Sequence, residues 1–287
     1  MHSVIFFITL VATILITVCA VSYAIKLATR RININKHLID LSMTLPISIL
    51  AVAFIIYVIP SYTPIVTMKN GAGQKLVFIG IQHIGIKSYY EDINDRLLAL
   101  RGNGFTILHE GVGMSGNVTV TLKSCSRVTD TESPHGVVTQ PNCIGQLHPG
   151  DIYADIQYED FLTLYAQQLQ DTLGVTLAEA KTMAKAKPSD IKSEVDSIKT
   201  DFIHYFAAKL VAMHKSSSYF ITTKWKSDDK ASPVIMTRRN QILSHYISAN
   251  QLSATAYGMA HISGVVEILK EKDPSWTVEK VDGIRSL

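Results

Sequence analysis

The chain has 287 residues, a formal net charge of +3 and a mean hydropathy of +0.19. So small a positive charge, without a basic stripe that carries aromatic residues, excludes nucleic acid as an expected partner. The hydropathy is high for a wholly soluble protein. Two runs without Asp, Glu, Lys or Arg account for it, residues 1–25 and 41–68.

Each run is longer than the roughly 20 residues that a helix needs to cross a bilayer. We therefore expect an N-terminal two-helix transmembrane hairpin within residues 1–68, with spans at about 4–25 and 42–66. A cleaved signal peptide is the alternative for the first run. That run lacks a basic start, however, and its apolar stretch is longer than signal peptides usually have.

The connector between the two runs predicts the orientation of the hairpin. It has four basic residues and one acidic residue, Lys26, Arg30, Arg31, Lys36 and Asp40. The positive-inside rule places such a connector in the cytoplasm. We therefore expect an anchor in the cytoplasmic membrane and a periplasmic or extracellular domain of residues 69–287.

Two tetrapeptides of the pattern Gly-x-x-His follow strand-like sequence. The apolar run that begins at Lys75 predicts a buried strand, which ends on Gly80 and leads to His83. Near the C-terminus, a run of small residues ends on Gly258 and leads to His261. Ligands bind at the carboxyl ends of strands in open α/β sheets, so the two histidines are expected at one site.

A helix near residues 89–100 and a strand from Gly104 to Glu110 complete a strand–helix–strand pattern. This pattern favours a right-handed βαβ unit with parallel strands. Glu110 is then expected at the same sheet edge as His83. His109 precedes Glu110 on the strand, should face the other side of the sheet, and is expected to be structural.

Two histidines and a carboxylate suffice to hold Zn²⁺, Mn²⁺ or Co²⁺ with open positions. An arginine is permanently charged and can stabilise a developing oxyanion. A helix expected over Met236–Ile247 carries Arg238 and Arg239 in its first turn, where the helix dipole disfavours a purely stabilising role. The alternatives are hydrogen-bonded core histidines and a surface arginine paired with an acid.

An insert at about residues 113–150 contains Cys125 and Cys143, which we expect to form a disulfide in an oxidising compartment. Two free thiols, or a metal site with His135 and His148, are the alternatives. Farther along, Thr176-Leu-Ala-Glu predicts the capping box of a helix.

Four segments together resemble the motif series of the TraB/PrgY/GumN group: Phe78-Ile-Gly-Ile-Gln-His, Ile107-Leu-His-Glu, Arg238-Arg-Asn and Tyr257-Gly-Met-Ala-His. That group is similar to the TIKI metalloproteases and, more remotely, to erythromycin esterases and the ChaN haem-binding proteins. The resemblance covers roughly residues 76–281. It implies an α/β fold with a mixed, largely parallel sheet flanked by helices.

The resemblance also implies roles for individual residues. It suggests a metal held by His83, Glu110 and His261, and a substrate carbonyl positioned by Arg239. The family arginine often follows an acidic residue, whereas Arg238 precedes it here, so the choice between Arg238 and Arg239 stays open. Asp155 either approaches the site, as a similar residue does in relatives, or caps the next helix. The remaining residues expected near the site are Gly80, Gly258 and Asn240.

These observations predict a membrane-anchored, metal-dependent hydrolase, a peptidase that acts on peptides or proteins outside the cytoplasmic membrane. The expected cofactor is a divalent metal, Mn²⁺, Co²⁺ or Zn²⁺. One alternative is a metal-independent, esterase-like hydrolase in which a histidine acts as general base beside Glu110. The other is a non-catalytic protein that sequesters a peptide or binds haem. The oligomeric state stays open.

Overall fold

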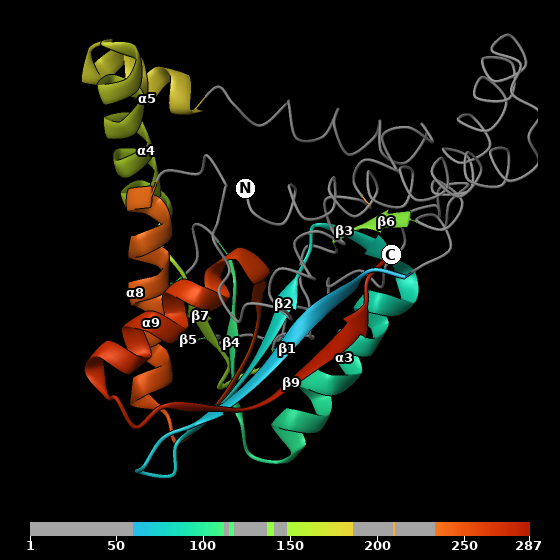
Figure 1. The fold of residues 1–287 in the computed structure, drawn as a ribbon. Helices are drawn as coiled ribbons and strands as arrows, with labels where there is room; N and C mark the ends of the chain where they lie inside the picture. Colours follow the sequence, from blue (N-terminus) through green and yellow to red (C-terminus); the bar gives the residue numbers. More distant parts are fainter. Residues whose placement is uncertain (1–59, 112–114, 118–136, 141–147, 186–208, 210–232) are drawn as a thin grey trace, which may run out of the picture.

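The computed structural model describes residues 60–111, 115–117, 137–140, 148–185, 209 and 233–287 (Figure 1). The expected first span, most of the second, Cys125 and Cys143 lie outside these ranges. Within them, no helix has both the length and the apolar content to cross a membrane.

The described residues contain a seven-stranded sheet with the strand order β5-β7-β4-β8-β2-β1-β9. Its strands are β1 (Tyr62–Lys69), β2 (Lys75–Ile81), β4 (Thr106–His109), β5 (Ser115–Asn117), β7 (Ile152–Ala154), β8 (Leu252–Gly258) and β9 (Thr277–Arg285). The four strands β7, β4, β8 and β2 run parallel to one another. β5, β1 and β9 pair antiparallel at the two sides. The expected mixed, largely parallel sheet is confirmed.

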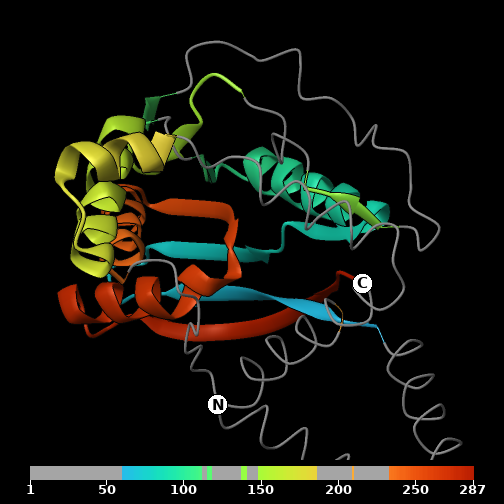
Figure 2. The ribbon, with the colours of Figure 1, turned by 90° about the horizontal axis from the view of Figure 1, so that it is seen from above.

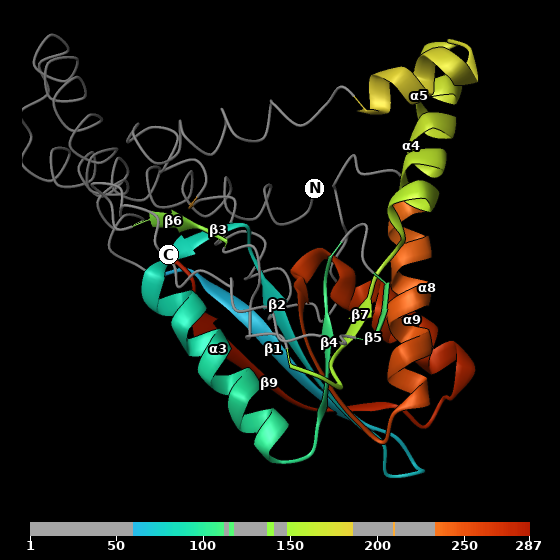
Figure 3. The ribbon, with the colours of Figure 1, turned by 180° about the vertical axis from the view of Figure 1, so that it is seen from behind.

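Helices cover both faces of this sheet (Figures 1 and 3). α3 (Lys87–Gly102) packs on one face, and α8 (Pro233–Ala249) and α9 (Ile262–Lys272) pack on the other. The short 3-10 helix η1 (Met259–His261) joins β8 to α9. α4 (Tyr158–Leu173) and α5 (Leu177–Lys185) project beyond α8, and the capping box expected at Thr176 and Glu179 is confirmed by reciprocal hydrogen bonds.

The central strands bury both of their faces. In β2, Phe78 packs toward α8 and α9, whereas Ile79 packs toward α3. In β4, Leu108 and Ile107 divide between the faces in the same way. Strands covered on both sides are apolar throughout rather than alternating, which is why these segments appear in the sequence as continuous apolar runs.

β1 corrects the expected boundary between membrane hairpin and domain. Tyr62–Lys69 lies in the sheet, between β2 and β9, although a helix was expected to extend to residue 66 and the domain to begin at residue 69. Ile65, Val66 and Met68 are at most 5% exposed there. A run without charges is equally typical of a membrane helix and of a strand buried on both faces, so this run did not distinguish them.

The expected βαβ unit is present, but its two strands are not neighbours. β8 lies between β2 and β4 and pairs parallel with both. Figure 2 shows β8, β2, β1 and β9 side by side in this order. A two-stranded sheet of β3 (Ile84–Ile86) and β6 (Val137–Thr139) adjoins the end of β2. The second Gly-x-x-His motif is thereby brought between the first motif and Glu110.

Candidate functional site

The carboxyl ends of the four parallel strands carry the residues of the candidate site. Asp155 follows β7, Glu110 follows β4, Gly258 ends β8, and His83 follows β2 after one intervening residue. Parallel neighbours end at the same edge of a sheet, so these residues share one edge although the chain between them is long. α8 supplies the remaining groups from the face that it covers.

Arg239 is the residue of the arginine pair that enters this site, while Arg238 is exposed. Arg239 is 13% exposed and bonds two carboxylates, those of Asp155 and Glu110. The signal that identifies it is helical spacing, because buried Ile235 and Leu243 lie four residues to either side. α8 begins at Pro233, so both arginines lie in its second turn and the expected first-turn placement was wrong.

Asp155 binds Arg239 through both of its oxygens. Nε of Arg239 donates to Oδ1 at 2.8 Å, and Nη2 donates to Oδ2 at 2.8 Å. The backbone N–H groups of Ile156 and Gly111 donate to the same carboxylate. Asp155 does not cap α4, whose N-cap residue is Gln157. Burial alone would raise the pKa of Asp155, but the hydrogen bonds and charge of Arg239 outweigh burial and lower it.

Glu110 is held at both oxygens as well. Oε1 accepts a hydrogen bond from Nη2 of Arg239 at 2.6 Å, and Oε2 accepts one from the backbone N–H of Gly258 at 2.8 Å. One guanidinium thus faces two carboxylates, which leaves the cluster one negative charge in excess. The hydrogen bonds of Arg239 use Nε and Nη2. Its Nη1 forms none with a described residue and is the donor available to a ligand.

His261 is a buried imidazole, 3% exposed, beside this ion pair. Its Nδ1 lies 2.7 Å from Oδ1 of Asn240, which can only accept a hydrogen bond, so Nδ1 carries the proton. Nε2 then keeps its lone pair. Burial, helped by the charge of Arg239, lowers the pKa of His261 to about 3. The ring is therefore neutral at physiological pH, with a fixed tautomer.

His83 repeats this arrangement at an exposed position. Its Nδ1 lies 2.8 Å from Oε1 of Gln140, so a side-chain amide again holds the proton on Nδ1 and leaves Nε2 as the lone-pair nitrogen. A positive charge on His83, when that ring is protonated, would lower the pKa of His261, so the two rings are within electrostatic reach. Nothing in the sequence pointed to Gln140, which follows β6 within the insert.

Tyr257 underlies the site and was also missed as a site residue. The guanidinium carbon of Arg239 lies 5.3 Å from the centroid of its ring, and the His261 ring meets it edge-on at 4.7 Å. The Tyr257 hydroxyl is buried and close enough to Asp155 to influence the pKa of that carboxyl. It nevertheless forms no regular hydrogen bond with any described residue. The Tyr257 hydroxyl thus interacts with Asp155 without full hydrogen-bond geometry, which is unusual for a buried phenol.

The glycines of the two motifs have different roles. A Cβ on Gly80 would lie 2.8 Å from Cβ of Met259 and 3.1 Å from the carbonyl oxygen of Pro64, so Gly80 is needed for packing rather than for approach to a ligand. A Cβ on Gly258 would meet only His261 and Glu110, at 3.4 Å or more. Gly258 therefore faces the space between these two side chains, whereas Gly80 does not.

The donor chemistry of the site fits a divalent cation. Both histidines have the arrangement typical of metal ligands, in which one ring nitrogen donates to a fixed oxygen and the other is left for the metal. The excess negative charge of the carboxylates also favours the binding of a cation. Among the described residues, however, no group of three or more His, Cys, Asp or Glu side chains is already arranged to hold a metal ion.

His109 lies in a separate cluster, toward α3, as strand alternation predicts. Its Nε2 is 2.9 Å from Oδ2 of Asp151, and Nη2 of Arg101, at the end of α3, donates to the same oxygen at 2.7 Å. Both Asp151 and His109 are buried. Their pairing joins β4, the start of β7 and the end of α3, which is a structural role.

Comparisons of the chain with protein-family models, with curated proteins and with solved structures found no match.

Proposed function

We propose that the protein is a metal-dependent hydrolase of peptide bonds, with its site at the carboxyl edge of the parallel strands. The observation that carries this proposal is the state of His261. A buried imidazole that is neutral, with its proton fixed on Nδ1 by Asn240, offers Nε2 to a metal at no cost in deprotonation. The resemblance to the TIKI metalloproteases, drawn from the motifs, supports the same assignment.

His83, His261 and Glu110 are the residues that would hold the metal, Mn²⁺, Co²⁺ or Zn²⁺. When bound, such a metal polarises a carbonyl group and lowers the pKa of a bound water to about 7. Gln140 and Asn240 orient the two imidazoles through their Nδ1–H groups. Gly258 fixes Glu110 by donating its backbone N–H to Oε2.

Arg239 supplies the positive charge for the reaction. Asp155 holds the guanidinium by a two-point bond, so its direction is set before a substrate arrives. The free N–H groups of Nη1 donate to the carbonyl oxygen of the substrate, and they stabilise the negative charge that develops there. Glu110, which shares Nη2 with Asp155, serves as a ligand of the metal or, instead, as the base that takes the proton from the attacking water and passes it to the leaving amine.

A metal-independent hydrolase is the second candidate, because no metal-holding group is assembled among the described residues. In that mechanism Nε2 of His261 would itself take the proton from water. A general base works best with a pKa near the working pH, whereas the pKa of His261 is lowered to about 3. Because the pKa of His261 lies far below the working pH, the ring is a weak base, which favours the metal-dependent mechanism. A protein that sequesters a peptide or haem would bind a ligand without turning it over.

Elemental analysis of the detergent-purified full chain, together with peptidase assays in Mn²⁺, Co²⁺ and Zn²⁺, tests the proposal. We expect one metal per chain and turnover that a chelator abolishes. His261→Ala should lose both, whereas His245→Ala, a change of the same residue type at an exposed position of α8, should lose neither. Turnover that survives complete metal removal would favour the second candidate. Peptide or haem binding without any turnover would favour the third.

The proposed location follows from the charge-free runs at the N-terminus, which we take as an anchor in the cytoplasmic membrane, with the α/β domain outside it. A reporter that is active only in the cytoplasm, fused after Leu287, should then be silent. The proposed disulfide between Cys125 and Cys143 depends on the same location. Alkylation of both thiols without a reductant would contradict it.

A further inference from the structure

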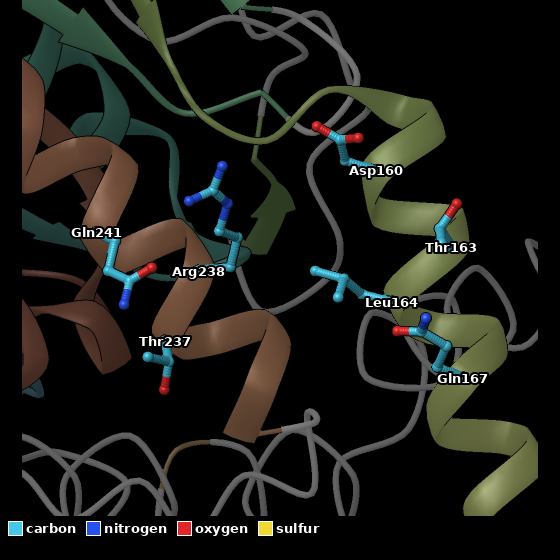
Figure 4. A pocket seen from close by; sticks show the side chains of 7 residues that line it. All are labelled: Asp160, Thr163, Leu164, Gln167, Thr237, Arg238 and Gln241. Atoms are coloured by element: carbon cyan, nitrogen blue, oxygen red, sulfur yellow. The ribbon is translucent and has the colours of Figure 1, made fainter.

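A groove lies beside the candidate site, between α4 and α8 (Figure 4). It is an open groove of about 610 Å³, a volume within the usual range for ligand sites, roughly 300–1,000 Å³. Its lining residues come from one face of each helix: Asp160, Thr163, Leu164 and Gln167 on α4, and Thr237, Arg238 and Gln241 on α8.

The groove adjoins the candidate site, because each of its walls carries a residue close in the chain to a residue of the site. On α8, Arg238 lines the groove and its chain neighbour Arg239 binds the two carboxylates of the site. On the other side, α4 begins three residues after Asp155, and Asp160 lies in its first turn. A substrate whose reacting carbonyl lies at Nη1 of Arg239 therefore has the groove within reach of its flanking segment.

The lining side chains match the groups of an extended peptide. Two hydroxyls and two carboxamides provide both donors and acceptors, which suits the alternating N–H and C=O groups of a backbone. Leu164 points from α4 toward α8 and offers one apolar contact (Figure 4). Arg238 and Asp160 add one charge of each sign, and neither forms an ion pair with a described residue.

We propose that this groove binds the segment of a peptide substrate that flanks the cleaved bond, and that it selects the segment by charge. Arg238 contacts an acidic residue of the peptide, and Asp160 contacts a basic one. This inference rests on the proposed hydrolase function and deepens it, because it names a peptide with charges of both signs as the substrate class. It also explains why an exposed arginine accompanies the buried one.

Two fluorescent peptides of identical composition, with the order of their acidic and basic residues exchanged, test the groove. Binding to the full chain is measured by anisotropy in a chelator, which separates binding from metal-dependent cleavage. The wild type should bind one isomer at least tenfold more tightly. The double variant Arg238→Glu with Asp160→Arg, which keeps the net charge, should reverse that preference.

The single variant Arg238→Glu should abolish the preference, and Lys270→Glu is its matched control, since it makes the same charge change at an exposed position of α9. Cleavage that none of the groove variants alters would overturn the groove and leave the hydrolase standing. A preference that the double variant reverses, without cleavage in any metal, would retain the groove and overturn the hydrolase. If the wild-type protein binds neither isomer, the groove is not a peptide site. A loss of thermal stability in the groove variants would then show that another part of the chain fills the groove.

Discussion

Arg239 and Asp155, 84 residues apart in the chain, form a two-point ion pair with both N···O distances at 2.8 Å. The Asp155 side chain is fully buried. The pair therefore fixes α8 to the end of β7, in addition to presenting Nη1 of Arg239 to the site. Its removal is expected to affect the fold as well as any activity.

Arg239→Ala is expected to destabilise the protein by about 3–5 kcal/mol, because it leaves a buried carboxylate without its partner. Arg239→Lys should also be costly, since the single nitrogen of an ammonium group cannot reproduce the planar two-nitrogen bond to Asp155. The free energy of unfolding, measured in urea, checks both. The double variant Arg239→Ala with Asp155→Ala should lose much less than the sum of the single losses, and strict additivity would contradict the pairing.

The stability of the metal-free protein should fall as the pH falls from about 6.5 toward 3. The pKa of His261 is lowered to about 3, so between these values the unfolded chain binds a proton that the folded chain excludes. The contribution of His261 to the free energy of unfolding is full above about pH 6.5. Below that pH it declines by as much as about 1.4 kcal/mol per pH unit. Urea unfolding across this range in His261→Gln should show a flatter profile. His245→Gln, at an exposed position of α8, should retain the wild-type slope.

Alanine at the two motif glycines should affect different properties, the stability of the fold at Gly80 and the function of the site at Gly258. Gly80→Ala is expected to destabilise the fold by about 1–3 kcal/mol, because the added methyl group overlaps Met259 and approaches the Pro64 carbonyl. Gly258→Ala should leave the thermal midpoint nearly unchanged while it places a methyl group between His261 and Glu110. Metal binding and turnover should therefore fall in Gly258→Ala alone. Equal thermal midpoints in the two variants would show that Gly80 is not a packing requirement.

Tyr257→Phe should cost little stability or increase it, because the hydroxyl that it removes has no regular hydrogen bond with a described residue. Tyr89→Phe is the matched control. The Tyr89 hydroxyl donates to the carbonyl of Gly80 and accepts from the backbone N–H of Gln82, so its removal should cost about 1–3 kcal/mol. Unfolding midpoints decide the comparison. A similar loss in Tyr257→Phe would show that the hydroxyl is bonded strongly, by Asp155 or by a buried water.

The sequence was most informative where a side chain's position follows from its own strand or helix. The apolar runs identified β2 and β4, and alternation along β4 assigned Glu110 and His109 to opposite faces. The pairing of Arg239 with Asp155 could not be predicted in this way, because it depends on how α8 packs on the sheet. Gln140 was missed for the same reason. β1 was misread because a membrane helix and a doubly buried strand share one composition.

The position of β8 between β2 and β4 has a consequence for the order of folding. β2 and β4 leave a ribosome long before residue 252, and until then the strand that separates them is missing. A chain that has emerged only to the end of α8 therefore exposes the unpaired edges of two apolar strands, the condition under which nascent chains aggregate or engage chaperones. Such a chain also lacks a complete site, because Glu110 lacks the N–H of Gly258 and Asn240 lacks His261 until β8 is inserted.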